Sequence, residues 1–325
     1  NRLLDGPAGM WCMQTGYGRR EIADAVAEQI MNLSYATTFT VINNREVELA
    51  ERIAAKTPGD LNRIYFTTGG STAVDSALRL CQLASNITGQ PKRKHILTRE
   101  KAYHGSTYLS ASITGKERDK TVMDIKRDGI HFLSAPCHFY HPEFATETEF
   151  CDFLVDELEQ KILELGPENV MCFIAEPILA SGGVIVPPAD YNYRCWQMVK
   201  KYNIIYIADE VVTGFGRLGH WFASKEVFDF QPDIICSAKG LTSGYQPLGA
   251  TIYSSKIHQV ISELGHGRCF THGFTYSGHP VACAAALKNI EIMEREQLLS
   301  HVKAIGPYFQ AQLKTLSDLP IVGDV

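Results

Sequence analysis

Apolar residues of the chain recur at the period of an α-helix in several segments. In the segment 19–33, Ile22, Val26 and Ile30 fall on one face and predict an amphipathic helix. The same pattern predicts further helices over 44–57, 71–85, 153–166 and 192–203. Gly166, at the end of the segment 153–166, is typical of a helix C-terminus.

Short and almost uninterrupted apolar runs lie between the predicted helices. They predict strands over 63–68, 94–100, 170–177, 204–211 and 233–239. Continuous apolar strands that alternate with helices are typical of a parallel sheet covered on both faces. The pattern therefore predicts an α/β fold with a mostly parallel central sheet and helices on both faces. Ligands of such folds bind beyond the carboxyl ends of the strands.

Polar residues stand at those carboxyl ends. Two glycines and a serine follow the first predicted strand at 69–71, and Glu176, Asp209 and Lys239 end three later strands. Because lysine and carboxylate side chains are rarely buried alone, each is either paired in a salt bridge or engaged with a ligand. We expect them to lie near one another at one edge of the sheet.

The bulk composition narrows the class of protein. The chain has 325 residues, is 45% hydrophobic and carries a formal net charge of −5. These values are typical of a soluble enzyme and argue against a partner that is a nucleic acid or a membrane. The nine cysteines form no CxxC pair and have no zinc-ligand spacing. We therefore expect reduced thiols, no metal and a cytoplasmic location.

The segment FTTGGSTAVDSALR has the form of a small phosphate-binding cup. A strand ends, Gly69 and Gly70 turn the chain, and Ser71 and Thr72 open a helix. Glycines let backbone N–H groups approach an anion, and the N-terminus of a helix adds its dipole. Neither a GxxxxGK[ST] nor a GxGxxG motif is present. A plain turn with a serine N-cap would give the same pattern.

Asp209 ends an apolar strand and would be costly to bury without a cation or a donor. It could form a salt bridge or cap the following loop, or it could hold a protonated ring nitrogen. Val211, two residues later, could pack against the face of such a ring. Tyr103, followed by His104 and Gly105, could lie over a ring, although composition alone favours a core tyrosine at a strand end.

Together these groups point to one ligand, pyridoxal 5′-phosphate (PLP). Its phosphate would bind at the helix N-terminus that follows Gly70, and its ring would lie under Tyr103. Its ring nitrogen would pair with Asp209, and its aldehyde would react with the amine of Lys239. Lys239 follows Asp209 by thirty residues, at the end of the next predicted strand.

The motifs that carry these residues resemble those of the class III aminotransferases of PLP fold type I, most closely the ω-amino acid or amine:pyruvate group. The most specific are YIADEVVTGFGRLG and PDIICSAKGLTSGYQPLGA, which match the family's segment from aspartate to lysine. DGPAGMWCMQTGYGR, YHGST, AEPILASGGVIVPP and HGFTYSGHPVACAAAL are also similar to family segments. The resemblance covers essentially the whole chain.

The resemblance implies roles for individual residues. Lys239 would be the catalytic lysine that links to PLP, and Asp209 would keep the ring nitrogen protonated. The other cofactor-binding residues that it implies are Gly70, Ser71, Tyr103, Glu176, Val211 and Thr275, with Trp11 in the substrate pocket. Because Thr275 would reach the phosphate in a neighbouring subunit, a homodimer with shared active sites is expected.

Three departures from the family pattern matter. Thr72 replaces the glutamate of the usual SGSEA phosphate motif. Val212 stands where ornithine- and GABA-type members carry glutamine, which argues against those two substrates. The arginine that receives the substrate carboxylate in the family is expected beyond Val325, with Arg217 and Arg268 as candidates within the chain.

The resemblance also implies three regions. Residues 1–45 would contribute to the substrate pocket, 46–280 would form the large PLP-binding domain, and 281–325 would form a connecting helix and the start of a small domain. The chain begins without methionine and stops at LPIVGDV, which looks like a turn into a strand. It is therefore expected to be a fragment that lacks the C-terminal domain.

The implied activity is the transfer of an amino group from an amine or ω-amino acid to pyruvate or a similar oxo acid. Lys239, freed by the amine donor, would act as general base and acid. A racemase or aminomutase remains an alternative, because PLP chemistry diverges through the substrate pocket while the cofactor residues stay the same. An inactive, truncated chain that still binds PLP is the other alternative.

Overall fold

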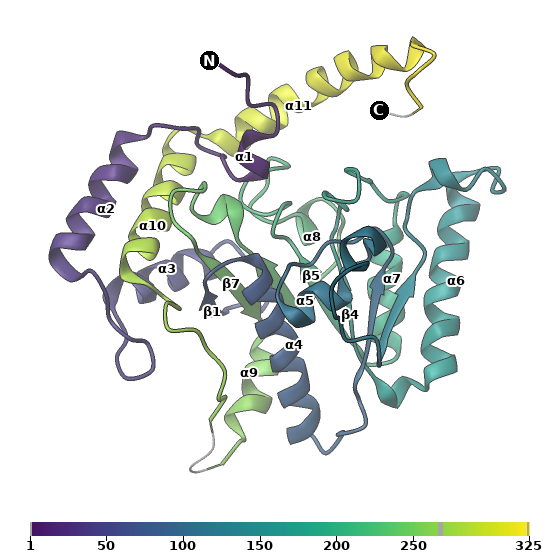
Figure 1. Ribbon diagram of the computed structural model, residues 1–325, viewed down its shortest axis with the longest axis horizontal. Helices are drawn as coiled ribbons and strands as arrows, with labels where there is room; N and C mark the ends of the chain where they lie inside the picture. The colour runs from purple at the N-terminus through teal and green to yellow at the C-terminus, as the bar shows by residue number, and fades with distance from the viewer. Residues whose placement is uncertain (1, 266–268, 324) are drawn as a thin grey trace.

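A seven-stranded sheet with the strand order β1-β7-β6-β5-β4-β2-β3 forms the centre of the computed structural model, which describes residues 2–265, 269–323 and 325 (Figure 1). The strands are β1 (Arg63–Thr67), β2 (His95–Arg99), β3 (Ile130–Leu133), β4 (Val170–Ala175), β5 (Ile205–Asp209), β6 (Ile234–Ser237) and β7 (Gly249–Tyr253). Strand β7 is antiparallel to both of its neighbours, and the other pairs are parallel. The carboxyl ends of six strands therefore share one edge, which confirms the predicted, mostly parallel sheet.

Helices cover both faces of this sheet. The helices of the described residues are α1 (Ala8–Trp11), α2 (Arg20–Leu33), α3 (Asn44–Ala54), α4 (Gly70–Ile87), α5 (Tyr108–Ile113), α6 (Glu147–Leu165), α7 (Tyr191–Lys201), α8 (Ala223–Glu226), α9 (Ser255–Ser262), α10 (Pro280–Arg295) and α11 (Leu298–Lys314). The predicted helices correspond to α2, α3, α4, α6 and α7. In the described part of the chain, no helix combines the length and the apolar character that crossing a membrane requires.

The core consists of two layers of apolar side chains, one on each face of the sheet. Successive strand residues point to opposite faces, so Phe173 and Tyr206 pack with α6 and α7. Their neighbours Ile174 and Ile207 pack with α4 and α9 on the other face. Burial on both faces is the reason why these strands appear in the sequence as continuous apolar runs.

Helix α6 begins at Glu147, earlier than the predicted start at 153. Thr146 accepts a hydrogen bond from the backbone N–H of Glu149, and the Glu149 side chain reaches back to the backbone N–H of Thr146. This capping box satisfies two N–H groups that the start of a helix otherwise leaves unpaired. The polar first turn, which carries no apolar period, therefore belongs to the helix.

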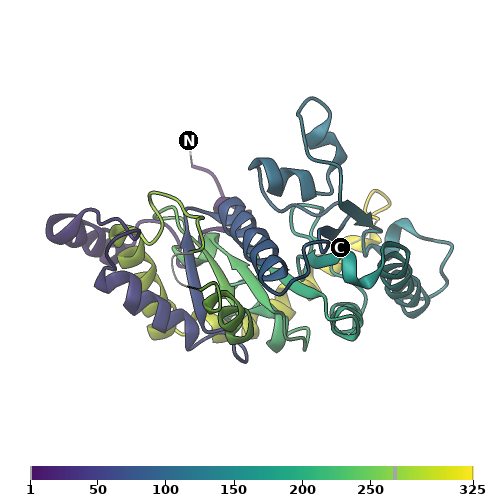
Figure 2. The ribbon, with the colours of Figure 1, turned by 90° about the horizontal axis from the view of Figure 1, so that it is seen from below.

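At one end of the molecule, α2, α3 and α10 lie together (Figures 1 and 2). Ile22 of α2 packs against Ala285 and Ile292 of α10, and all three side chains are fully buried. Helix α10 therefore fixes the N-terminal part of the chain to the body of the fold, beside the segment that follows β6.

Candidate active site

The register of the sheet brings the polar ends of three strands side by side. Ala175 of β4 pairs with Ala208 of β5, and Asp209 pairs with Cys236 of β6. Glu176 follows Ala175 directly, so it lies next to Asp209. Lys239 lies three residues beyond Cys236, at the same edge of the sheet.

Asp209 is held by two hydrogen bonds. Its Oδ2 lies 2.7 Å from Nδ1 of His104, and its Oδ1 accepts a bond from the backbone N–H of Val211 at 3.1 Å. The His104 side chain is fully buried and that of Asp209 is 4% exposed. The orientation of this buried carboxylate is therefore fixed from two sides. The sequence alone does not predict which residue pairs with Asp209, and the structure shows that this partner is His104.

Glu176 supports the segment that carries Tyr103. Its carboxyl oxygens accept hydrogen bonds from the backbone N–H groups of Tyr103 at 2.9 Å and Ala180 at 3.2 Å. Burial raises the pKa of Glu176 to about 7, although the neighbouring His104 opposes the shift. Glu176 therefore fixes the backbone below the predicted ring-stacking tyrosine and titrates near neutrality.

Arg99, which the sequence analysis also missed, braces the same corner. It is the last residue of β2 and is fully buried. Its Nη2 donates a hydrogen bond to the backbone oxygen of Glu176, and its guanidinium lies 5.7 Å from the centre of the Tyr191 ring. An arginine inside an apolar strand is a signal in the sequence, because so large a cation is rarely buried without partners.

The predicted phosphate cup lies at the N-terminus of α4. Ser71 Oγ accepts a hydrogen bond from the backbone N–H of Ser106 at 3.0 Å, and Ser106 Oγ lies 2.9 Å from the Tyr103 hydroxyl. Gly105 has a φ of +134°, and a methyl group at this position would lie 2.5 Å from Ser71 Oγ. The structure therefore brings the Tyr103 segment into close contact with the cup.

Gly70 and Val211 also lie against each other. A methyl group at Gly70 would approach Cγ1 of Val211 to 3.0 Å, whereas one at Gly69 would meet no atom within 4 Å. Open space therefore remains beside the first turn of α4. Thr72, the departure from the family motif, donates from its hydroxyl to the backbone oxygen of Gly69 at 2.9 Å. It stabilises the turn that forms the cup.

Lys239 has an unusual backbone conformation. The predicted strand 233–239 ends at Ser237, and Lys239 opens a 3-10 turn, Lys239–Leu241, with a φ of +39°. Only a few per cent of residues other than glycine adopt a positive φ. The side chain is half-buried. The chain thus leaves the sheet abruptly at the lysine.

The sequence matches the family described as "Aminotransferase class-III" over residues 1–325. The chain belongs to the class III aminotransferases. It is 42% identical over 326 residues to the putrescine–pyruvate aminotransferase of Pseudomonas aeruginosa, covering 100% of this chain and 71% of that protein. It is 39% identical over 328 residues to gamma-aminobutyrate transaminase 1 of Oryza sativa subsp. indica, covering 100% of this chain and 63% of that protein.

Solved structures give the same result. An (S)-enantioselective ω-transaminase from Thermomicrobium roseum superimposes with a TM-score of 0.95 at 41% sequence identity. The match covers 99% of this chain and 71% of that chain. The protein therefore has the fold of an aminotransferase of PLP fold type I and is a transaminase.

Class III aminotransferases use PLP, and the residues at the strand ends fit this cofactor. The first turn of α4 offers backbone N–H groups beside the open space at Gly69. Asp209 offers a buried carboxylate, and Lys239 offers an amine at the end of the adjacent strand. Within 2–265, 269–323 and 325, no group of three His, Cys, Asp or Glu residues could hold a metal ion.

The contacts of Thr275 and of the segment around Trp11 involve other residues. Thr275 is exposed, and its backbone oxygen accepts a hydrogen bond from the Tyr35 hydroxyl at 2.8 Å. Trp11 ends α1 and is half-buried. The residues after Trp11 pack on the lysine turn, since a methyl group at Gly244 would lie 3.0 Å from Sδ of Met13.

The two candidate receptors for a substrate carboxylate differ. Arg217 donates from Nη2 to Gln14 Oε1 at 2.5 Å and lines a cavity of about 90 Å³ together with Met13. Burial lowers the pKa of Arg217. Arg268 lies outside the residues that the structure describes.

Proposed function

We propose that this aminotransferase moves an amino group from an amine or ω-amino acid to pyruvate or a similar oxo acid. The observation that carries the proposal is the placement of Lys239 and Asp209 at the ends of adjacent strands, with Asp209 buried and oriented by His104. Pyruvate is favoured as the acceptor because a relative that is 42% identical is a putrescine–pyruvate aminotransferase.

Each site residue has a role in this proposal. Bound PLP supplies an electron sink for the reacting carbon. The amine of Lys239 takes up the proton of the carbon that bears the amino group. Asp209 would place a negative charge at the ring nitrogen, while Gly70 and Ser71 would bind the phosphate through the start of α4. Tyr103 would lie over one face of the ring.

A panel of amines tests the proposal. The PLP-loaded protein is mixed with amines and ω-amino acids, with pyruvate or 2-oxoglutarate as the acceptor. We expect the visible absorbance of the lysine-linked cofactor to fall with the amine and to return with pyruvate. Lys239→Ala should show neither change nor a borohydride-reducible link to PLP. Turnover of an amine without any oxo acid would favour a racemase or an aminomutase.

GABA is a second candidate donor. Val212 argues against it on the family pattern, but a relative that is 39% identical is named a gamma-aminobutyrate transaminase. The panel should therefore contain both GABA and putrescine. A higher kcat/KM for GABA with 2-oxoglutarate than for putrescine with pyruvate would reverse the assignment.

We further propose that the working form is a homodimer with shared sites. The apolar segment 30–42 begins in the last turn of α2 and continues beyond the end of that helix. Its exposed apolar side chains are Ile30, Met31, Leu33, Phe39, Val41 and Ile42. Exposed apolar surface of this kind is typical of protein–protein interfaces. The hydrogen bond from Tyr35 ties Thr275 to this segment. The family resemblance implies that Thr275 would then reach the phosphate bound in the second copy.

A further inference from the structure

The turn that begins at Lys239 contains three residues with positive φ. They are Lys239 at +39°, Ser243 at +50° and Gly244 at +74°. Positive φ is ordinary for glycine, but lysine and serine adopt it only where the surrounding structure imposes it. The turn therefore needs external contacts to keep the lysine at its place.

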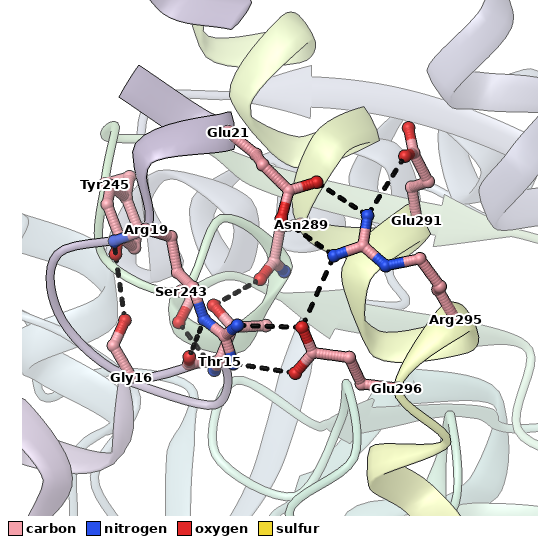
Figure 3. A network of polar contacts seen from close by, with 10 residues as sticks. All are labelled: Thr15, Gly16, Arg19, Glu21, Ser243, Tyr245, Asn289, Glu291, Arg295 and Glu296. Carbon is pink, nitrogen blue, oxygen red and sulfur yellow. Dashed lines mark hydrogen bonds and ion pairs between the residues drawn. The ribbon is translucent and has the colours of Figure 1, made fainter. Parts of the chain in front are cut away.

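Asn289 of α10 provides such contacts, and Figure 3 shows its side chain hydrogen-bonded to Thr15. Its side chain is fully buried. Nδ2 donates hydrogen bonds to the backbone oxygens of Gly240 at 2.9 Å and Leu241 at 3.0 Å, the two residues that follow Lys239. Oδ1 accepts a hydrogen bond from the Thr15 hydroxyl at 3.1 Å. One carboxamide thus connects the lysine turn to the N-terminal segment.

The N-terminal segment holds the other end of the same turn. The backbone N–H of Thr15 donates to Ser243 Oγ at 3.0 Å. The Tyr245 hydroxyl accepts a hydrogen bond from the backbone N–H of Arg19 at 2.7 Å and donates to the backbone oxygen of Gly16 at 2.9 Å (Figure 3). Both ends of the turn are therefore attached to the segment 15–19.

Ion pairs surround this arrangement on its outer side. Arg19 pairs with Glu296 at 2.8 Å, and Arg295 pairs with Glu21 at 2.6 Å (Figure 3). These side chains are 30–47% exposed, and exposed ion pairs contribute little to stability. The buried hydrogen bonds of Asn289 are stronger candidates for fixing the turn, because each group that lost its partner would be left buried and unpaired.

We propose that Asn289 is a positioning residue for Lys239 and that Asn289, Thr15 and Ser243 form a carboxamide clamp around the lysine turn. The proposal rests on the proposed role of Lys239. The amine must meet the aldehyde of PLP and later a substrate proton, and a misplacement of about 1 Å can cost on the order of a hundredfold in rate. The clamp also ties the lysine to the segment that follows Trp11.

The experiment uses Asn289→Asp, which keeps the shape of the side chain but cannot donate to the two carbonyls, and Asn289→Ala. Two readouts are made on protein freed of PLP. The first is hydrogen–deuterium exchange of the amides in 240–245. The second is the rate at which added PLP is captured at Lys239, followed by borohydride quenching and peptide mass spectrometry.

We expect exchange in 240–245 to become faster and capture at Lys239 to become slower, each by about tenfold, because two buried hydrogen bonds are lost. Ile290→Ala is the matched control, since Ile290 is equally buried in α10 but packs into the main core. If the Asn289 variants do not fold, Thr15→Val removes only the hydroxyl that holds Oδ1, and Thr15→Ser should restore the wild-type values.

Two results overturn different claims. If the Asn289 and Thr15 variants match Ile290→Ala in both readouts, Asn289 is only a packing residue and the clamp is refuted. If the wild-type protein captures PLP at another lysine, the proposed function is refuted, whatever the exchange data show.

Discussion

Asp209, Glu176 and Glu210 are three carboxyl groups buried at the same edge of the sheet. A buried carboxylate is stable only where donors reach it. The donors of Asp209 include an imidazole, and those of Glu176 are backbone amides of the segments around the site. Glu210 instead accepts from the start of α8 and is therefore a structural anchor. Asp209 and Glu210, neighbours in one motif, are thus held by different parts of the fold.

Asp209→Asn should reduce turnover at least a hundredfold while the protein remains folded. The amide cannot supply the negative charge at the ring nitrogen, and a hundredfold loss corresponds to roughly 3 kcal/mol of activation free energy. Turnover with putrescine and pyruvate and the far-ultraviolet circular dichroism spectrum measure the two effects. Near-normal turnover would make Asp209 a purely structural partner of His104.

Glu176 should make the stability of the cofactor-free protein fall as the pH rises. Burial raises its pKa from the usual 4.5 to about 7, so between these values the folded state keeps a proton that the unfolded state has lost. The free energy of unfolding should therefore decrease by up to about 3 kcal/mol from pH 4.5 to 7. Above that pH this contribution stays constant.

Urea unfolding of wild type and Glu176→Gln at several pH values from 4.5 to 8 measures this contribution. The glutamine variant cannot titrate, so the difference between the two proteins should change with pH over the same window. Glu168→Gln is the control, because Glu168 is exposed. A difference that is constant with pH would show that folding does not raise the pKa of Glu176.

At the scale of elements, the site depends on close contact between the segment after β2 and the first turn of α4. Gly105→Ala should weaken PLP binding at least tenfold, because its methyl group would overlap the Ser71 hydroxyl. Overpacking of this kind costs about 1–3 kcal/mol. Gly89→Ala is a control for a methyl group added at a positive φ, here +72°, with open space around it. Equal PLP affinities in the two variants would contradict the expectation.

Apolar periodicity predicts the elements that are long or buried on both faces. Strands β4, β5 and β6 and helices α2 and α4 lie within a few residues of their predicted positions. Strands β3 and β7 were not predicted, because His131 interrupts the short apolar run of β3 and β7 begins with glycine and alanine. Their pairing is decided by neighbours that are distant in the sequence.

The site likewise contains residues that the sequence predicts and residues that it does not. Strand ends and glycines mark Lys239, Asp209 and Gly70 in the sequence, so their placement at one edge of the sheet could be predicted, while their roles stay predictions. The partner of Asp209 could not be, since His104 is 105 residues away and meets it only after the sheet has formed. The left-handed backbone of Lys239 likewise depends on contacts with Asn289, fifty residues further along the chain.

For the whole molecule, the apolar segment 30–42 is the main argument for assembly. Met31→Glu should convert a homodimer into a monomer, because Met31 is 86% exposed and a buried, unpaired charge at an interface is costly. Leu163→Glu is the control. It places the same charge on an exposed position of α6, at the opposite end of the molecule (Figure 1). Light scattering after size-exclusion chromatography gives the masses, and a monomeric wild type would refute the proposed dimer.

The antiparallel strand β7 also has a consequence for the order of folding. Among the described strands, β1 lies at the edge of the sheet and pairs only with β7. Arg63 pairs with Tyr253, so β1 cannot join the sheet until the ribosome has synthesised β7. Strands β2 to β6 can pair with one another before that, and contacts between residues so far apart in sequence form slowly. We therefore expect the corner around Asp209 to form before the predicted phosphate cup is anchored. A nascent chain that ends before β7 would contain the folded corner around Asp209, but the predicted phosphate cup at the start of α4 would not yet be fixed.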